Sequence, residues 1–248
     1  GDVSQEKAIA IANRLIANLP KGTINLPELP KLEPLAPASS SQREVRIANP
    51  AQQAHIQMGI TAIPRNSPDY FPLLVGNYVL GGGGFVSRLM NEVREKRGLA
   101  YSVYSYLNPG KSSGFFSAAM QTKKDQAEES VQLLRKTIQE YVENGPTPEE
   151  LVAAKSNLIN GFPLRIDSNS KLLDNISSIA WHDLPLNTLD EWTNQVNQVT
   201  QFLHRRYKRP HLRARQHQFL FQGGQLCKHL QSLDLNDEQH GLLHREYK

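Results

Sequence analysis

The histidines of this sequence are the side chains best suited to bind a catalytic metal, so their spacing decides whether the chain could hold one. A hydrolytic zinc site usually takes two histidines from one helical face and a third ligand from elsewhere. Neither H-E-x-x-H nor H-x-x-E-H occurs, and around His240 and His244 the places that need glutamate hold Gly241 and Leu243. We therefore predict no metal site on this chain.

Two further residues could carry chemistry but stand in patterns that favour other roles. His55 alternates with apolar residues as in a strand, which favours a packed or hydrogen-bonded histidine over a metal ligand. Cys227 is the single cysteine, so it cannot form an internal disulfide, and no G-x-S-x-G pattern is present. The sequence thus supports neither a serine nor a cysteine nucleophile.

Four consecutive glycines could bring a backbone close to a ligand. A phosphate loop is disfavoured, because the run lacks G-x-G-x-x-G and no Gly-Lys-Ser/Thr follows it. We expect a tight turn between two helices, where glycine would also let the backbone of another chain approach closely. The candidate peptide-approach loop consists of Gly81, Gly82, Gly83 and Gly84.

Arg94 and Tyr101, seven positions apart, combine a fixed cation with a phenolic hydroxyl. An arginine near a helix end can pair with a peptide carbonyl or carboxylate. A tyrosine at the start of the next strand can donate to the oxyanion that forms when a scissile carbonyl becomes tetrahedral. In the structural alternative, Arg94 pairs with Glu95 or another surface acid, and Tyr101 is a strand residue with a solvated hydroxyl.

The hydropathy pattern around these residues predicts strands and helices in an α+β order. Alternating apolar residues predict a strand of about ten residues ending near Ile60, and Thr147, Pro148 and Glu150 predict a capping box at a helix start. Further strands are expected over 99–107 and 114–120, and helices over 69–80, 89–97, 124–143, 149–162, 169–181 and 187–198.

Composition divides the chain into four parts. Residues 1–20 predict a helix capped by Ser4, and residues 21–42 form a Pro/Ser-rich linker. The body covers 43–200, and the periodic, capped elements are expected to end near Thr200. Residues 201–248 form a basic tail with six of the eight histidines. No apolar run is long enough to predict a membrane span.

The segment from Ser87 to Ser105, SRLMNEVREKRGLAYSVYS, is the most specific stretch of the sequence. Together with Leu80 and the glycine run, it resembles the second-domain signature of pitrilysin/insulinase-type peptidases, especially the small bacterial processing-peptidase-like members. The opening Gly-Asp-Val-Ser and its helix resemble the end of the preceding half in that family. The similarity covers roughly residues 1–198.

This resemblance implies an α+β domain with an antiparallel or mixed sheet and helices packed on one face, as in mitochondrial-processing-peptidase-like domains. It implies that Arg94 and Tyr101 match the Arg and Tyr that reach the substrate. The partner would be a zinc-bearing domain or subunit with H-x-x-E-H, in a clamshell arrangement and in a homo- or heterodimer. We expect the substrate to be a peptide, the zinc to belong to the partner, and the chain to be inactive alone. The same analogy implies the bacterial periplasm or cell envelope.

Two other functions stay open. The family includes structural subunits that assemble without cleaving peptides, and this chain could be one of them. The basic tail, with six Arg/Lys and no acid in residues 201–215, could instead bind an anionic polymer. Aromatic residues are sparse there, which disfavours nucleic acid. A third account of the tail is a shifted reading frame, because the family would place a short helix and a closing apolar strand in this region.

Overall fold

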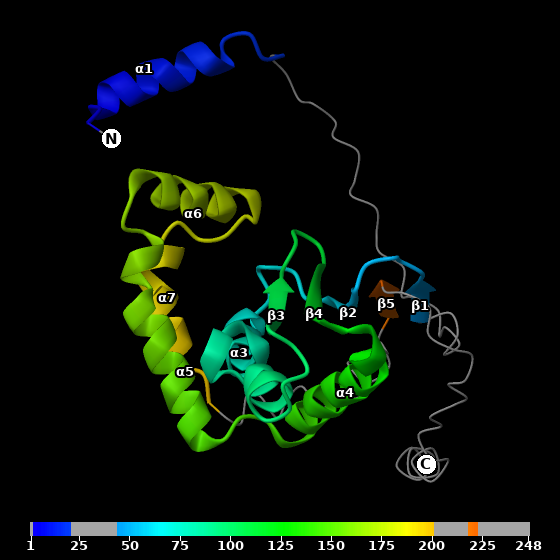
Figure 1. Ribbon diagram of the computed structural model, residues 1–248. Coiled ribbons are helices and arrows are strands. Elements are labelled where there is room, and N and C mark those ends of the chain that lie inside the picture. Colours follow the sequence, from blue (N-terminus) through cyan, green and yellow to red (C-terminus); the bar gives the residue numbers. More distant parts are fainter. Residues whose placement is uncertain (1, 21–43, 201–217, 223–248) are drawn as a thin grey trace, which may run out of the picture.

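The computed structural model describes residues 2–20, 44–200 and 218–222. Its scaffold is a five-stranded sheet with the strand order β1-β5-β2-β4-β3 (Figure 1). β1 and β5 run parallel, and the other neighbours are antiparallel, so the sheet is mixed, as expected. The strands are β1 (Glu44–Ile47), β2 (Gln53–Ala62), β3 (Val103–Asn108), β4 (Gly114–Lys123) and β5 (Gln218–Gln222).

The alternation predicted for β2 sorts its side chains onto two faces of the sheet. Ala54, Ile56 and Met58 are buried, whereas His55 and Gln57 are exposed. The expected ten-residue strand is confirmed. Of the two roles expected for His55, packing in the core is excluded by its exposure, because successive strand residues point to opposite faces and His55 shares the open face with Gln57.

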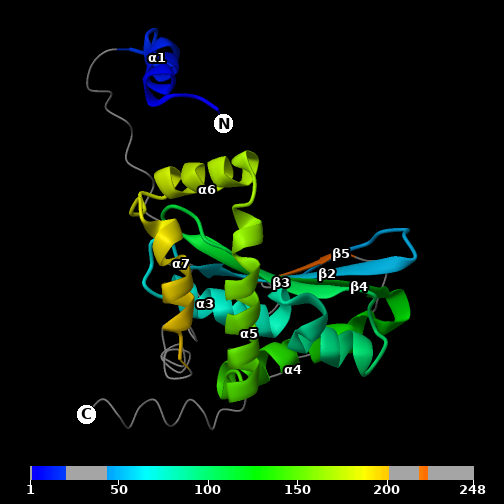
Figure 2. The same ribbon diagram turned by 90° about the vertical axis from the view of Figure 1, so that its left-hand side faces the viewer.

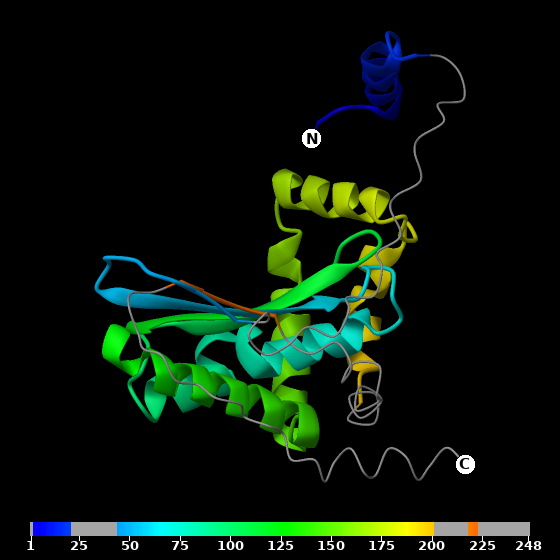
Figure 3. The same cartoon turned by 90° about the vertical axis from the view of Figure 1, so that its right-hand side faces the viewer.

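Helices cover the buried face of the sheet and one of its ends. α3 (Tyr70–Asn77) and α4 (Ala127–Asn144) lie below the sheet in Figure 3. α5 (Pro148–Gly161) and α7 (Thr188–Asn197) stand at one end, and α6 (Asn169–Trp181) lies higher, on the side of the open face (Figure 2). The α+β class and the layer of helices on one face are therefore confirmed.

The core lies between this layer of helices and the sheet. Its most buried aliphatic residues come from β2, α3, α4 and the segment before β3. Ile56 of β2, Val75 of α3 and Leu134 of α4 are at most 1% exposed, as are Leu89 and Val93 from the segment before β3. Truncation of such a buried leucine to alanine typically costs about 2–5 kcal/mol. The segment that carries Arg94 is thus fixed to the core by its neighbours.

Residues 201–248 contribute to this sheet. β5 lies between β1 and β2, although the periodic elements were expected to end near Thr200. The family resemblance implies a closing apolar strand in this region, but no local pattern places that strand between β1 and β2, because the partners of β5 are far away along the chain. The linker predicted at 21–42, Cys227, His240, His244 and the basic run at 201–215 lie outside the described residues.

α1 (Gln5–Ile16) begins as predicted, with the Ser4 hydroxyl accepting a hydrogen bond from the amide of Lys7 at 3.3 Å. None of its residues is buried, and its apolar side chains, including Ile9 and Leu15, are exposed. The helix lies apart from the sheet and its helices in Figure 1. Within the described residues, no helix combines the length and the hydropathy needed to cross a bilayer.

Candidate functional site

Arg94 and Tyr101, the two residues singled out in the sequence, lie together on the surface. The guanidinium carbon of Arg94 is 5.0 Å from the ring centroid of Tyr101 and 4.9 Å from that of Phe85. Both aromatic residues are strongly exposed, Tyr101 at 84% and Phe85 at 69%. A guanidinium within about 6 Å of a ring face is attracted by the ring quadrupole. The result is an exposed cluster of one cation and two aromatic rings.

A tight chain reversal brings Tyr101 back to Arg94. The π-helix η3 (Met90–Glu95) is followed after two residues by Gly98, whose φ of 61° is the left-handed conformation that glycine adopts most easily. The Gly98 amide donates to the Arg94 carbonyl at 2.8 Å, and the hydroxyl of Thr122 on β4 donates to the carbonyl of buried Leu99 at 2.6 Å. These bonds fix the turn that carries Tyr101.

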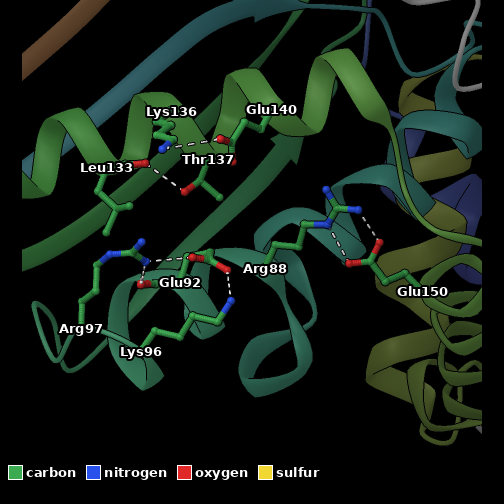
Figure 4. Close-up of polar contacts among 9 residues, drawn as sticks. All are labelled: Arg88, Glu92, Lys96, Arg97, Leu133, Lys136, Thr137, Glu140 and Glu150. Carbon is green, nitrogen blue, oxygen red and sulfur yellow. Dashed lines mark hydrogen bonds and ion pairs between the residues drawn. The ribbon is translucent and has the colours of Figure 1, made fainter.

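The start of the same segment is fixed to α5 by a two-pronged ion pair. Arg88 donates from Nε and a terminal nitrogen to the two carboxylate oxygens of Glu150, at 2.6 and 2.5 Å (Figure 4). Arg88 also donates to the Gly145 carbonyl at 2.9 Å. The hydrogen bonds to Glu150 raise the pKa of Arg88. Burial alone would raise the pKa of Glu150, but the bonds from Arg88 and the Thr147 amide outweigh it and hold this pKa below its usual value.

Glu150 also completes the predicted capping box. The Thr147 hydroxyl accepts from the Glu150 amide, and the Glu150 carboxylate accepts from the Thr147 amide, so the prediction is confirmed. One carboxylate therefore joins the start of α5 to the segment that carries Arg94. Sequence reasoning found the cap but missed Arg88, because the two partners are far apart in the chain.

The surface acids beside Arg94 provide the contact expected by the structural alternative. Arg94 Nε lies 3.6 Å from Glu95 Oε1, in a surface pair whose arginine side chain is 28% and whose glutamate side chain is 54% exposed. Exposed pairs of this kind contribute about 0–1 kcal/mol. Glu92 pairs instead with Lys96 and Arg97 (Figure 4), and their hydrogen bonds lower the pKa of Glu92. Arg94 thus has a weak ionic contact and two ring contacts.

The glycine run is part of a helical path and does not form a simple turn between two helices. The π-helix η1 (Tyr78–Gly82) continues α3, and a 3₁₀ turn, η2 (Gly84–Val86), follows Gly83. A Cβ at Gly81 would lie 2.5 Å from the Ser105 backbone nitrogen, so this close approach is to the chain's own strand β3. Gly84, with φ of 62° and no neighbour within 4 Å of a Cβ, is open and directly precedes Phe85.

A second group of polar side chains lies on the open face of the sheet. A pocket there is lined by His55, Gln57, Ser102, Tyr104 and Gln121, together with parts of Ile56, Ala119 and Met120. Sequence reasoning missed this pocket. The alternation in β2 indicated that His55 and Gln57 share a face, but pairing with β4 was needed to place Gln121 opposite His55.

An aromatic row continues from the pocket along the open face. The rings of Tyr104 and Tyr106 are stacked at 6.2 Å, and Tyr106 meets Phe115 edge-on at 5.7 Å.

The described residues lack a ligand set for zinc. Over residues 2–20 and 44–200, no three His, Cys, Asp or Glu side chains come together as zinc would require. The cluster and the open face together offer hydrogen bonds, the cation of Arg94 and aromatic contacts.

Comparison with known families identifies the fold. Residues 1–158 match the sequence profile of the family described as the peptidase M16 inactive domain. The chain belongs to this family. The resemblance to pitrilysin/insulinase-type peptidases is thereby confirmed, including its second, inactive type of domain.

Relatives of this M16 inactive domain differ in what their names say about activity. A protein named non-peptidase homolog YmxG, of Helicobacter pylori, is 32% identical over 81% of the chain and 45% of its own length. An uncharacterized zinc protease of Streptomyces coelicolor is 33% identical over 69% of the chain and 38% of its own length. The chain thus spans less than half the length of these relatives.

Solved structures agree with the assignment. A peptidase M16 inactive domain from Pseudomonas fluorescens superposes with a TM-score of 0.78 at 34% identity, over 93% of this chain and 54% of that one. The M16 inactive domain described above therefore shares its fold with a larger protein of the same family.

Proposed function

We propose that this M16 inactive domain binds the peptide substrate of a zinc endopeptidase and completes the active site of a zinc-bearing partner domain or subunit. The observation that carries the proposal is the contact of Arg94 with the exposed ring of Tyr101. The cation and the phenol are held side by side on a segment that is fixed to the core at both ends. Such preorganisation lowers the cost of binding and of stabilising charge during a reaction.

The two side chains have different roles in this proposal. The guanidinium of Arg94 keeps its donors available to a peptide carbonyl or carboxylate, because its contacts within the described residues are with two aromatic rings and, at 3.6 Å, with Glu95. The hydroxyl of Tyr101 donates to the oxygen of the scissile carbonyl as negative charge develops there. Gly84 leaves room beside Phe85 for the peptide backbone.

The zinc of this enzyme belongs to the partner. The described residues do not offer a ligand set that fits zinc, and the Streptomyces coelicolor relative, of which the matched part is 38%, is named a zinc protease. We expect the purified chain to contain no stoichiometric zinc and to cleave no unstructured peptide. Metal analysis that finds one tightly bound zinc per chain would contradict this division of roles.

Steady-state kinetics of the reconstituted complex tests the proposal. Tyr101→Phe should lower kcat about 10²-fold with little change in KM, because it removes one donor to the oxyanion. Arg94→Ala should mainly raise KM, because a hydrogen bond to a charged group contributes about 1.5–3 kcal/mol. Tyr106→Phe removes a phenolic hydroxyl from the open face and is the matched control. Unchanged kinetics in both variants, or losses that follow a large fall in melting temperature, would assign the pair to structure.

A non-proteolytic role is the second candidate, and the name of the Helicobacter pylori relative favours it. In that case the chain would assemble with a partner but contribute nothing to cleavage. The exposed apolar side of α1 is compatible with either function, because a preceding half-domain would cover it in both. Kinetics of the reconstituted complex distinguish the two candidate functions, since only the first predicts that Tyr101→Phe lowers turnover.

A further inference from the structure

The pocket on the open face contains hydrogen-bonding groups that the described chain does not use. The side chains of His55, Ser102 and Gln121 and the Tyr104 hydroxyl have no hydrogen-bond partner among the described residues. Gln57 donates from Nε2 to the Ser117 hydroxyl at 3.4 Å. The side-chain carbonyl oxygen of Gln57 remains an acceptor on the open face of the sheet. Both donors and acceptors therefore converge in one hollow.

The charge of the lining limits what could bind there. Among the described residues, the lining holds the imidazole of His55 and otherwise neutral side chains, without Asp, Glu, Lys or Arg. A carboxylate or ammonium group would lose water without gaining an ionic partner, which is costly. A carboxamide fits better, because it presents an acceptor oxygen and two donor hydrogens to a lining that holds both kinds of group.

The position of the pocket links it to the Arg94–Tyr101 cluster. Ser102 lines the pocket and directly follows Tyr101, and Tyr104 begins the aromatic row on β3. If a peptide is bound at Tyr101, a nearby side chain of that peptide would therefore lie at the pocket.

We propose that the pocket formed by His55, Gln57, Ser102, Tyr104 and Gln121 is a specificity subsite for an Asn or Gln side chain of the bound peptide. This inference rests on the proposed function for the position of the peptide backbone. It adds the chemical class of the side chain that the domain selects, and it names Gln121 and His55 as the residues that select it.

Binding of short unstructured peptides to the full chain tests the subsite. The peptides share one sequence, except that Gln, Glu, Lys or Leu is placed in turn at each central position, and isothermal titration measures Kd. At one position, Gln should bind roughly fivefold to tenfold more tightly than Leu, Glu or Lys, as one or two neutral hydrogen bonds allow. Gln121→Ala should abolish this preference, and Gln121→Glu should transfer it to the Lys peptide.

Lys123 supplies the matched control, since it is exposed on β4 two residues beyond Gln121 and does not line the pocket. Lys123→Gln should leave the Gln preference unchanged. A preference for Glu that disappears in Lys123→Gln would overturn the amide subsite in favour of simple charge attraction. Thermal melting of each variant must match the parent, which is expected for exposed side chains.

The outcomes of these titrations distinguish a failure of the subsite from a failure of the proposed function. If Arg94→Ala weakens all peptides equally while no position prefers Gln, the subsite is wrong and the peptide-binding role stands. If the Gln preference disappears in Gln121→Ala but Arg94→Ala changes no Kd, the subsite stands and the role of Arg94 is wrong. If no peptide binds at millimolar concentration, both are overturned.

Discussion

The face of the Tyr101 ring holds the guanidinium of Arg94, with 5.0 Å between the guanidinium carbon and the ring centroid. This contact is part of the free protein, so it can be measured without a partner or a substrate. A double-mutant cycle with Arg94→Ala and Tyr101→Ala should give a coupling of about 0.5–1 kcal/mol in urea unfolding. Tyr101→Phe should keep the coupling, because the ring remains. Loss of the coupling in Tyr101→Phe would instead assign it to the hydroxyl.

The ion pair between Arg88 and Glu150 should make stability depend on pH. Both side chains are less than a third exposed, and Glu150→Gln should cost about 2 kcal/mol at neutral pH. The pKa of Glu150 is lower in the folded state than its unfolded value of about 4.3. Its stabilisation is therefore complete above that unfolded pKa and is lost as the pH falls through the folded pKa.

Urea unfolding of the parent and of Glu150→Gln from neutral to strongly acidic pH checks this sign. The difference between the two should be constant above about pH 5 and should shrink as the pH falls further. Glu140→Gln is the control, because its pair with Lys136 at 3.8 Å is more than half exposed on both sides (Figure 4). A difference that grows towards acidic pH would show that burial dominates the ionisation of Glu150.

The glycines of the run should respond differently to alanine. Gly81→Ala places a Cβ against the backbone of β3 and should cost about 3 kcal/mol or more. Gly84→Ala meets no atom, but its left-handed backbone should cost about 1–2 kcal/mol. Gly161→Ala, at the end of α5 with open space and no positive φ, should stabilise by up to about 1 kcal/mol. Equal urea midpoints for the first two variants would contradict the packing argument.

A chain that ends at Thr200 should keep its core but lose order at one side of the sheet. Such a chain lacks β5, the neighbour of both β1 and β2, while the pairing of β2 with β4 is untouched. We expect a lower melting temperature and faster hydrogen exchange of the β1 amides, with slow exchange retained in β4. Unchanged exchange in β1 would show that its contacts with α4, such as the pair between Arg46 and Glu128, suffice to hold it.

Local signals in the sequence predicted much of this fold. The alternation in β2, the capping box at Thr147 and the turn at Gly98 depend on neighbouring residues, and the structure has all three, although η3 already ends at Glu95. The partnership of Arg94 with Tyr101 also follows from a short chain reversal. What the sequence could not reveal depends on distant contacts, including the pairing of Arg88 with Glu150 and the position of β5. The π-helical turns were hidden for another reason, since their hydropathy pattern hardly differs from that of an α-helix.

The position of β5 has a consequence for how the protein is made. Glu44 at the start of β1 pairs with Phe219, so the two strands come from opposite ends of the sheet-forming part of the chain. Contacts between such distant residues slow folding, because a long loop must close before they form. Synthesis delivers the N-terminal strands first, so β1 and β2 remain without the strand between them until residues 218–222 have left the ribosome. Unpaired strand edges attract other chains, so this interval is when the nascent protein most needs a chaperone.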